Sequence, residues 1–158
     1  MATSLKNLSQ HSEANIADIR KKKFALLVSE WNDEITESLY SGALETLLRH
    51  GAMREHIVRK NVPGSFELPL GAQWMAKRED IDAVICLGCV IQGETRHFEF
   101  ICNAVAQGIT QVGLTFDKPV IFGVLTPDTQ QQALDRAGGK HGNKGDEAAI
   151  TAIKMLGF

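Results

Sequence analysis

His97 is the residue of this sequence best suited to proton transfer. It ends the segment Gly93-Glu94-Thr95-Arg96-His97, which follows the most apolar run of the chain and precedes apolar residues at helical spacing. An imidazole changes its protonation near neutral pH, and free amides at the start of a helix bind phosphate. The segment therefore predicts proton transfer beside an anion, although a histidine that caps or packs the helix would give the same pattern.

Other side chains suited to binding lie at similar places between apolar runs. Trp31 and Phe66 could stack on a flat ligand, and either could equally serve as ordinary packing. Ser65 and Glu67 suit a helix start, where the carboxylate could bind ring N–H groups or complement the helix dipole. Arg136 stands beside a glycine-rich segment and suits bidentate phosphate binding, while a solvated arginine is the alternative.

Two of the three cysteines form the pattern Cys86-Leu87-Gly88-Cys89, a spacing that also occurs in redox and zinc sites. In an extended strand these two residues point to opposite faces, and no second pair completes a set of four zinc ligands. We therefore interpret both as small core residues and predict no metal site. Four further histidines lack neighbouring clusters of metal ligands and are expected at the surface: His11, His50, His56 and His141.

The hydrophobic pattern predicts an α/β protein. Short apolar runs alternate with segments of helical period, which is typical of a parallel sheet covered by helices. We expect a three-layer sandwich with a central four-stranded sheet. The predicted strands span 24–29, 56–62, 83–91 and 119–125, and the predicted helices lie within 33–50, 68–77, 98–113, 133–136 and 149–156. Thr126-Pro127-Asp128 is expected to cap the fourth helix, and 138–145 to form a loop.

In open parallel sheets, ligands bind beyond the carboxyl ends of the strands. This rule selects four segments, which begin at Trp31, Gly64, Gln92 and Thr126. The sequence has no glycine-rich nucleotide-binding motif after a strand, which argues against the common nucleotide sites.

Length and composition restrict the class of protein. The 158 residues fit one domain, which we place at 23–158 after a polar N-terminal tail at 1–22. The formal net charge of −2 gives no support to nucleic-acid binding, and no apolar run is long enough for a membrane span or resembles a signal peptide. The low, odd number of cysteines is typical of a reducing compartment, so we expect a cytoplasmic protein.

Three motifs together resemble the lumazine synthase family. They are Asn61-Val62-Pro63-Gly64-Ser65-Phe66-Glu67-Leu68-Pro69, Gly93-Glu94-Thr95-Arg96-His97-Phe98 and the segment from Arg136 to Gly145, in family order and at family spacing. The resemblance runs from about Phe24 to Leu156. It implies a flavodoxin-like fold and the condensation of 5-amino-6-(D-ribitylamino)uracil with 3,4-dihydroxy-2-butanone 4-phosphate to 6,7-dimethyl-8-ribityllumazine, without a metal or organic cofactor.

The resemblance also implies roles for individual residues. His97 matches the family's proton-transfer histidine, and Trp31 matches the aromatic residue that stacks on the pyrimidine, where phenylalanine is common. The other matching positions bind the ribityl chain (Ser65, Phe66, Glu67), the pyrimidine edge (Cys89, Val90, Ile91) and the butanone phosphate (Glu94, Thr95, Arg136, with Lys144 nearby), or line the site from the adjacent subunit (Phe122).

The family forms pentamers, and in some members twelve pentamers build an icosahedral shell. The resemblance to the family therefore implies a homopentamer. The segment 138–145 resembles the short form of shell-forming members, so we favour the shell, with riboflavin synthase as a candidate partner. Two alternatives remain open. One is a non-catalytic ligand-binding or shell-forming protein of the same fold, and the other is a flavodoxin-like FMN carrier.

Overall fold

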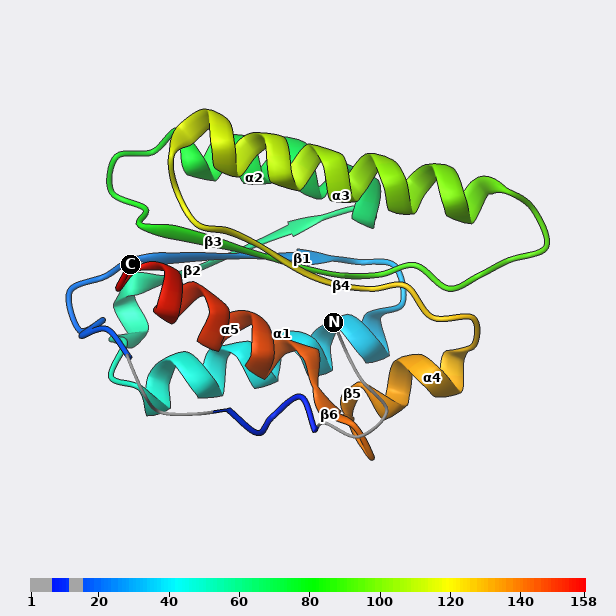
Figure 1. Ribbon diagram of the computed structural model, residues 1–158, viewed down its shortest axis with the longest axis horizontal. Coiled ribbons are helices and arrows are strands. Elements are labelled where there is room, and N and C mark those ends of the chain that lie inside the picture. The colour runs from blue at the N-terminus through cyan, green and yellow to red at the C-terminus, as the bar shows by residue number, and fades with distance from the viewer. Residues whose placement is uncertain (1–6, 12–15) are drawn as a thin grey trace.

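A parallel β-sheet forms the centre of the computed structural model, which describes residues 7–11 and 16–158 (Figure 1). Residues 1–6 and 12–15 of the predicted tail lie outside the described residues. The strands are β1 (Phe24–Ser29), β2 (Ile57–Val62), β3 (Ala83–Cys89), β4 (Val120–Leu125), β5 (Ala137–Gly139) and β6 (Gly142–Asn143). The α-helices are α1 (Asp33–Arg49), α2 (Leu68–Ala76), α3 (His97–Phe116), α4 (Gln130–Asp135) and α5 (Lys144–Met155). Two 3₁₀ turns are η1 (Arg54–His56) and η2 (Ser65–Glu67).

The main sheet has four parallel strands in the order β2-β1-β3-β4, which confirms the predicted α/β class. The central strands β1 and β3 are buried along their whole length. Their continuous apolar sequences are typical of strands covered on both faces, because each face must pack against helices.

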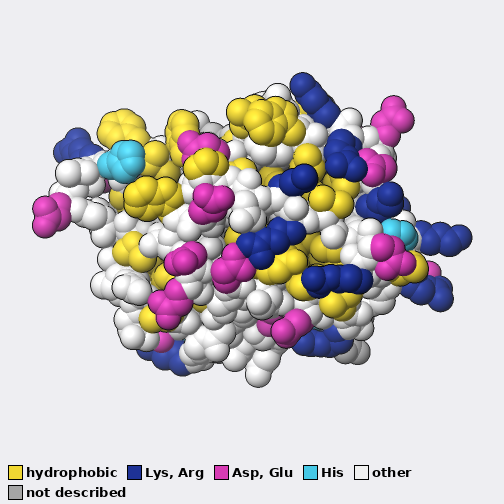
Figure 2. Space-filling model, turned by 180° about the vertical axis from the view of Figure 1, so that it is seen from behind, with side chains coloured by type: hydrophobic (Ala, Val, Ile, Leu, Met, Phe, Trp, Pro, Cys, Tyr) yellow, Lys and Arg dark blue, Asp and Glu magenta, His cyan; other side chains and the backbone are white. Residues whose placement is uncertain are grey.

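Two helix layers cover the sheet, and alternate residues of each strand face different layers. Phe24 and Leu26 pack in the core under α1 and α5, whereas Ala25 and Leu27 pack in the core under α2 and α3. Figure 1 shows the α2–α3 layer on one side of the sheet and the α1–α5 layer on the other. Seen from behind, apolar side chains also gather on the outer surface of the molecule (Figure 2).

Three local predictions were wrong. Strand β3 ends at Cys89, so Val90 and Ile91 follow the strand, although the Val90 amide still donates to the Leu125 carbonyl at 2.9 Å. The helix α4 is capped by Thr129, whose hydroxyl accepts from the Gln132 amide at 3.2 Å, and Thr126-Pro127-Asp128 lies before this cap. The expected loop 138–145 contains the antiparallel hairpin β5–β6 and the first residues of α5.

The described parts of the N-terminal segment pack on the rest of the chain. Leu8 and Ile19 are buried, and Ile19 belongs to the core under α1 and α5. The boundary between a tail at 1–22 and a domain at 23–158 stays a prediction. Within residues 7–11 and 16–158, no helix combines the length and apolarity needed to cross a bilayer.

Candidate active site

A cavity of about 440 Å³ lies at the carboxyl edge of the sheet, where the segments after β1, β2 and β3 meet the start of α3. Its lining consists of Trp31, Asn32, Gly64, Ser65, Phe66, Cys89, Val90, Ile91, His97 and Ile101. The topology explains why these segments lie together, because the carboxyl ends of parallel strands point to one edge of the sheet. Seven of the residues singled out in the sequence therefore share one cavity.

Two aromatic side chains stand at its rim. Trp31 is 73% exposed and follows β1, and Phe66 is 55% exposed and lies in η2. Large aromatic rings usually bury most of their surface in a core. Their exposure beside a cavity therefore favours the stacking interpretation over ordinary packing.

Gly64 and Glu67 lie at the two ends of the 3₁₀ turn that carries Phe66. A side-chain oxygen of Glu67, Oε2, accepts from the Gly64 amide at 3.0 Å and so caps the 3₁₀ turn. This bond holds the carboxylate close to the cavity-lining Gly64. Glu67 thus caps the turn, as expected for a carboxylate at a helix start, and the group that it caps is the Gly64 amide.

Ser65 supplies a buried hydroxyl with hydrogen-bonding capacity to spare. Its Oγ and that of Ser29 are buried, and neither has a hydrogen-bond partner in the described part of the chain. Both lie over β3, since a Cβ atom placed on Gly88 would be 2.5 Å from the Ser65 Oγ and 3.3 Å from the Ser29 Oγ. Buried hydroxyls normally have partners, so the cavity-lining Ser65 hydroxyl is available to a ligand.

Asn32 lines the cavity directly after Trp31, in the first of the four segments selected at the strand ends. Its backbone is left-handed, with φ 60° and ψ 49°, and its side chain forms no cap bond. The side-chain amide donates to the Cys89 carbonyl at 3.0 Å and ties the β1–α1 turn to the end of β3. An asparagine three residues after the end of a buried strand was the available signal, because asparagine tolerates this conformation better than most residues.

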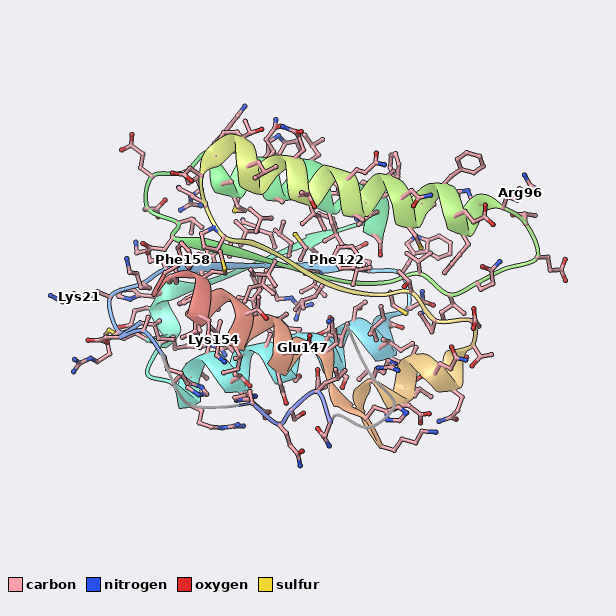
Figure 3. All side chains as sticks on the ribbon, in the orientation of Figure 1. Lys21, Arg96, Phe122, Glu147, Lys154 and Phe158 are labelled. Carbon is pink, nitrogen blue, oxygen red and sulfur yellow. The ribbon has the colours of Figure 1, made fainter. Side chains whose placement is uncertain are left out.

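His97 is the first residue of α3, as predicted, and its ring is exposed at the cavity. Glu94 and Thr95 lie outside the cavity lining, in the exposed loop before the helix, and the His97 amide donates to the Thr95 hydroxyl at 3.4 Å. Figure 3 shows the neighbouring Arg96 at the far end of this loop, directed away from the sheet. The imidazole of His97, at the start of α3, thus lines the cavity, whereas the polar side chains of the preceding loop lie outside the cavity lining.

The two motif cysteines are unsuited to nucleophilic chemistry. Cys86 faces the core under α2 and α3, and Cys89 faces the core under α1 and α5, which confirms that they point to opposite faces. Burial raises the pKa of the Cys86 thiol to about 12, and burial together with the nearby Cys102 thiol raises the pKa of Cys89 to about 12. Both are therefore neutral thiols near pH 7. No group of three or more potential metal ligands occurs among the described residues.

Arg136 and Lys144 line a second pocket of about 310 Å³, which begins where β4 ends. Its other lining residues are Leu8, Val124, Leu125, Thr126, Pro127 and Gln132. The Arg136 Nη1 atom is buried and has no hydrogen-bond partner among residues 7–11 and 16–158, and the Lys144 ammonium forms an ion pair with Glu147 at 3.1 Å. Because a buried guanidinium nitrogen needs an acceptor, this pocket suits an anion.

The two pockets lie at the same sheet edge but have no lining residue in common. The ends of β3 and β4 remain joined, since the Gln92 amide donates to the Pro127 carbonyl at 2.9 Å. Phe122 belongs to neither pocket. It lies midway along the edge strand β4 (Figure 3) and lines a third groove of about 770 Å³ between α3 and α5.

Fold and cavities define an α/β protein with a ligand-sized, aromatic-rimmed cavity at the carboxyl edge of a parallel sheet. The family model for 6,7-dimethyl-8-ribityllumazine synthase matches residues 21–158. The chain therefore belongs to the 6,7-dimethyl-8-ribityllumazine synthase family.

Curated relatives agree over nearly the whole chain. The 6,7-dimethyl-8-ribityllumazine synthase of Cytophaga hutchinsonii is 65% identical over 156 residues, covering 99% of this chain and 98% of the relative. The proteins of the same name from Parabacteroides distasonis and Porphyromonas gingivalis are 53% and 49% identical, each covering all of this chain and 99% and 98% of the relative.

Proposed function

We propose that this chain condenses 5-amino-6-(D-ribitylamino)uracil with 3,4-dihydroxy-2-butanone 4-phosphate to 6,7-dimethyl-8-ribityllumazine, a step of riboflavin biosynthesis. The observation that carries the proposal is the cavity whose lining includes His97 together with Trp31, Phe66 and the carboxyl end of β3. Membership of the family supports the reaction, and the cavity supplies a stacking surface, backbone groups and a proton-transfer group for it.

The pyrimidine substrate is planar and has several ring N–H and C=O groups. We place its ring against Trp31 and its edge along the backbone of Cys89, Val90 and Ile91, which lie at the carboxyl end of β3 and line the cavity. The ribityl chain has hydroxyl groups that match the unpartnered Ser65 hydroxyl and the backbone of 65–67. A stacked, hydrogen-bonded ring holds the 5-amino group in one orientation, which is the main contribution that positioning makes to a condensation.

The butanone phosphate needs a cationic subsite. We assign its phosphate to Arg136, whose Nη1 atom lacks a partner, with Lys144 nearby and with Glu94 and Thr95 from the loop before α3. The reaction proceeds through an imine, then loss of phosphate to an enol, and then ring closure. His97 would move protons in these steps, because each exchanges a proton between carbon, nitrogen and oxygen atoms.

A complete site requires more than one copy of the chain in this proposal. Within one chain, Phe122 and the Arg136 pocket do not line the His97 cavity. An adjacent subunit can supply them, so we propose a homopentamer with active sites between subunits and, from the short hairpin at 137–143, assembly of twelve pentamers into an icosahedral shell. Riboflavin synthase, which would consume the product, is the proposed protein partner.

The proposed location is the cytoplasm. Cys86, Cys89 and Cys102 are all free thiols, which suits a reducing compartment.

The test is the absorbance change on mixing the purified protein with both substrates, corrected for the uncatalysed reaction. Acceleration that requires both substrates is the expected result. No acceleration by a protein that is assembled in the same sample would favour the alternative, a non-catalytic binding or shell protein. Uptake of FMN by the purified protein would instead favour a flavin carrier.

A further inference from the structure

The hairpin β5–β6 sets the spacing of the two cationic residues that line the second pocket. Arg136 directly precedes β5, and Lys144 directly follows β6. The Lys144 amide donates to the Arg136 carbonyl at 2.8 Å, so the hairpin closes on itself at these two residues. Any displacement of the hairpin therefore moves both cations.

The N-terminal segment 7–9 holds this hairpin from outside. The Leu8 amide donates to the His141 carbonyl at 2.7 Å, and the Ser9 hydroxyl accepts from the Asn143 amide at 3.0 Å. The Ser9 amide in turn donates to the Asn7 side chain at 2.9 Å, which fixes the conformation of the segment. The segment thus supplies partners to the turn and to β6.

Gly142 makes this close approach possible. Its φ of +80° is a conformation that favours glycine, and a Cβ atom there would lie 2.7 Å from the Ser9 nitrogen and 2.9 Å from the Leu8 nitrogen. Both distances are too short for real contacts. The hairpin turn is therefore shaped to receive the backbone of the N-terminal segment.

Leu8 reaches the pocket itself. Its side chain is only 5% exposed, and it lines the pocket together with Arg136 and Lys144. An apolar wall excludes water beside a guanidinium group, and charge interactions are stronger where water is excluded. Leu8 therefore contributes both to the position of the cations and to their surroundings.

We propose that Leu8 is a positioning residue of the phosphate subsite, acting through the hairpin that carries Arg136 and Lys144. The inference rests on the proposed function, which assigns the substrate phosphate to this pocket. Leu8 touches no reacting atom in this proposal. Its effect is on the affinity for the phosphate-bearing substrate.

The experiment compares Leu8→Ala, Leu8→Met, Gln10→Ala and Arg136→Ala in the full chain. For each, kcat and the KM of both substrates are measured, together with inhibition by inorganic phosphate as a probe of the anion subsite. Leu8→Met keeps the apolar volume. Gln10→Ala is the matched control, because Gln10 is an exposed residue of the same segment that does not line the pocket.

Leu8→Ala should raise the KM of the butanone phosphate and the inhibition constant of phosphate about tenfold, the lower end of what lost supporting contacts usually cost. The KM of the pyrimidine should stay unchanged, and both Leu8→Met and Gln10→Ala should resemble the wild type. An unchanged KM for the butanone phosphate in Leu8→Ala, or an equal rise for both substrates, would overturn the inference.

Arg136→Ala separates this inference from the assignment of the phosphate. If Arg136→Ala raises the KM of the butanone phosphate and Leu8→Ala does not, only the role of Leu8 is wrong. If Arg136→Ala has no such effect, the phosphate assignment is wrong and the inference falls with it. Should Leu8→Ala fail to fold, Ser9→Ala carries the same test, because it removes only the hydroxyl that accepts from Asn143.

Discussion

Replacing Asn32 should destabilise the protein through two contributions that can be measured separately. The left-handed backbone at this position, φ 60° and ψ 49°, is unfavourable for most side chains, whereas glycine adopts it freely. The side chain donates to the Cys89 carbonyl at 3.0 Å. Asn32→Ala loses the hydrogen bond and acquires the backbone penalty, while Asn32→Gly loses only the bond.

The size of each effect follows from these two observations. A hydrogen bond of this kind contributes about 0.5–1.5 kcal/mol to stability, and a left-handed backbone costs an ordinary residue about 1–2 kcal/mol. We therefore expect Asn32→Gly to lower the free energy of unfolding by about 1 kcal/mol and Asn32→Ala by about 2–3 kcal/mol. Asp117 is the control, because it also has a positive φ, of 50°, but is exposed at the end of α3. Asp117→Gly should change stability by less than about 0.5 kcal/mol.

Urea unfolding at one fixed protein concentration measures these differences, since assembly makes apparent stability depend on concentration. The expected order of unfolding midpoints is wild type, Asn32→Gly and Asn32→Ala, from highest to lowest. Equal losses for the two variants would refute the backbone contribution. A wild-type midpoint for Asn32→Gly would refute the hydrogen bond to Cys89.

At the candidate site, His97→Ala should lower kcat by up to about 10²-fold, since one positioned proton-transfer group typically contributes 10²–10⁴; unchanged turnover would remove His97 from the mechanism. Arg136→Ala should raise the KM of the butanone phosphate far more than that of the pyrimidine, and equal effects in steady-state kinetics would indicate a disturbed subunit interface instead. Burial, and then the charge of His50, lower the pKa of His11 from 6.5. As the pH falls, His11 is therefore protonated more readily when the N-terminal segment is released than when it is docked. Docking of the segment is fully present above pH 6.5 and weakens as the pH falls through the lowered pKa of the docked state. The melting temperature of the wild type should decrease below pH 6.5, and that of His11→Gln should lack this decrease. Melting temperatures of the two proteins that change in parallel with pH would contradict this.

The environment of His11 explains the direction of that shift. Its ring lies 5.9 Å from the His50 ring, between centroids, and its Nδ1 atom is buried with no hydrogen-bond partner among the residues that the structure describes. The charged groups around it are His50, Arg49 and Lys154, which lower its pKa, and Asp146, which raises it. Among the described residues, burial together with His50, Arg49 and Lys154 outweighs the effect of the Asp146 carboxylate.

Sequence patterns with a short period predicted the fold well. The alternation of Phe24, Ala25, Leu26 and Leu27 between two helix layers follows from the two-residue repeat of a strand. The opposite orientation of Cys86 and Cys89 follows from the same repeat. The carboxyl ends of parallel strands share one edge of the sheet, and this rule places Trp31 and His97 at the same edge. The rule depends only on the order of strands and helices, which the sequence predicts.

Only the tertiary structure shows which of the predicted binding residues share a pocket. Arg136 and Lys144 stand outside the cavity that holds His97, and Leu8 joins them from more than a hundred residues away in the sequence. The hydrogen bond from Asn32 to Cys89 likewise joins the ends of two strands. Contacts between distant segments leave no periodic pattern in the sequence, so they could not be predicted from it.

Local sequence patterns were thus sufficient to predict the α/β class, the edge of the sheet where the cavity lies and, through three motifs, the family. The tertiary structure alone decided the docking of 7–9 on the hairpin and the separation of the His97 cavity from the Arg136 pocket. The physical reason is that local periodicity records which face of an element is buried. It does not record which distant segment, such as Leu8 against Gly142, fills the remaining space.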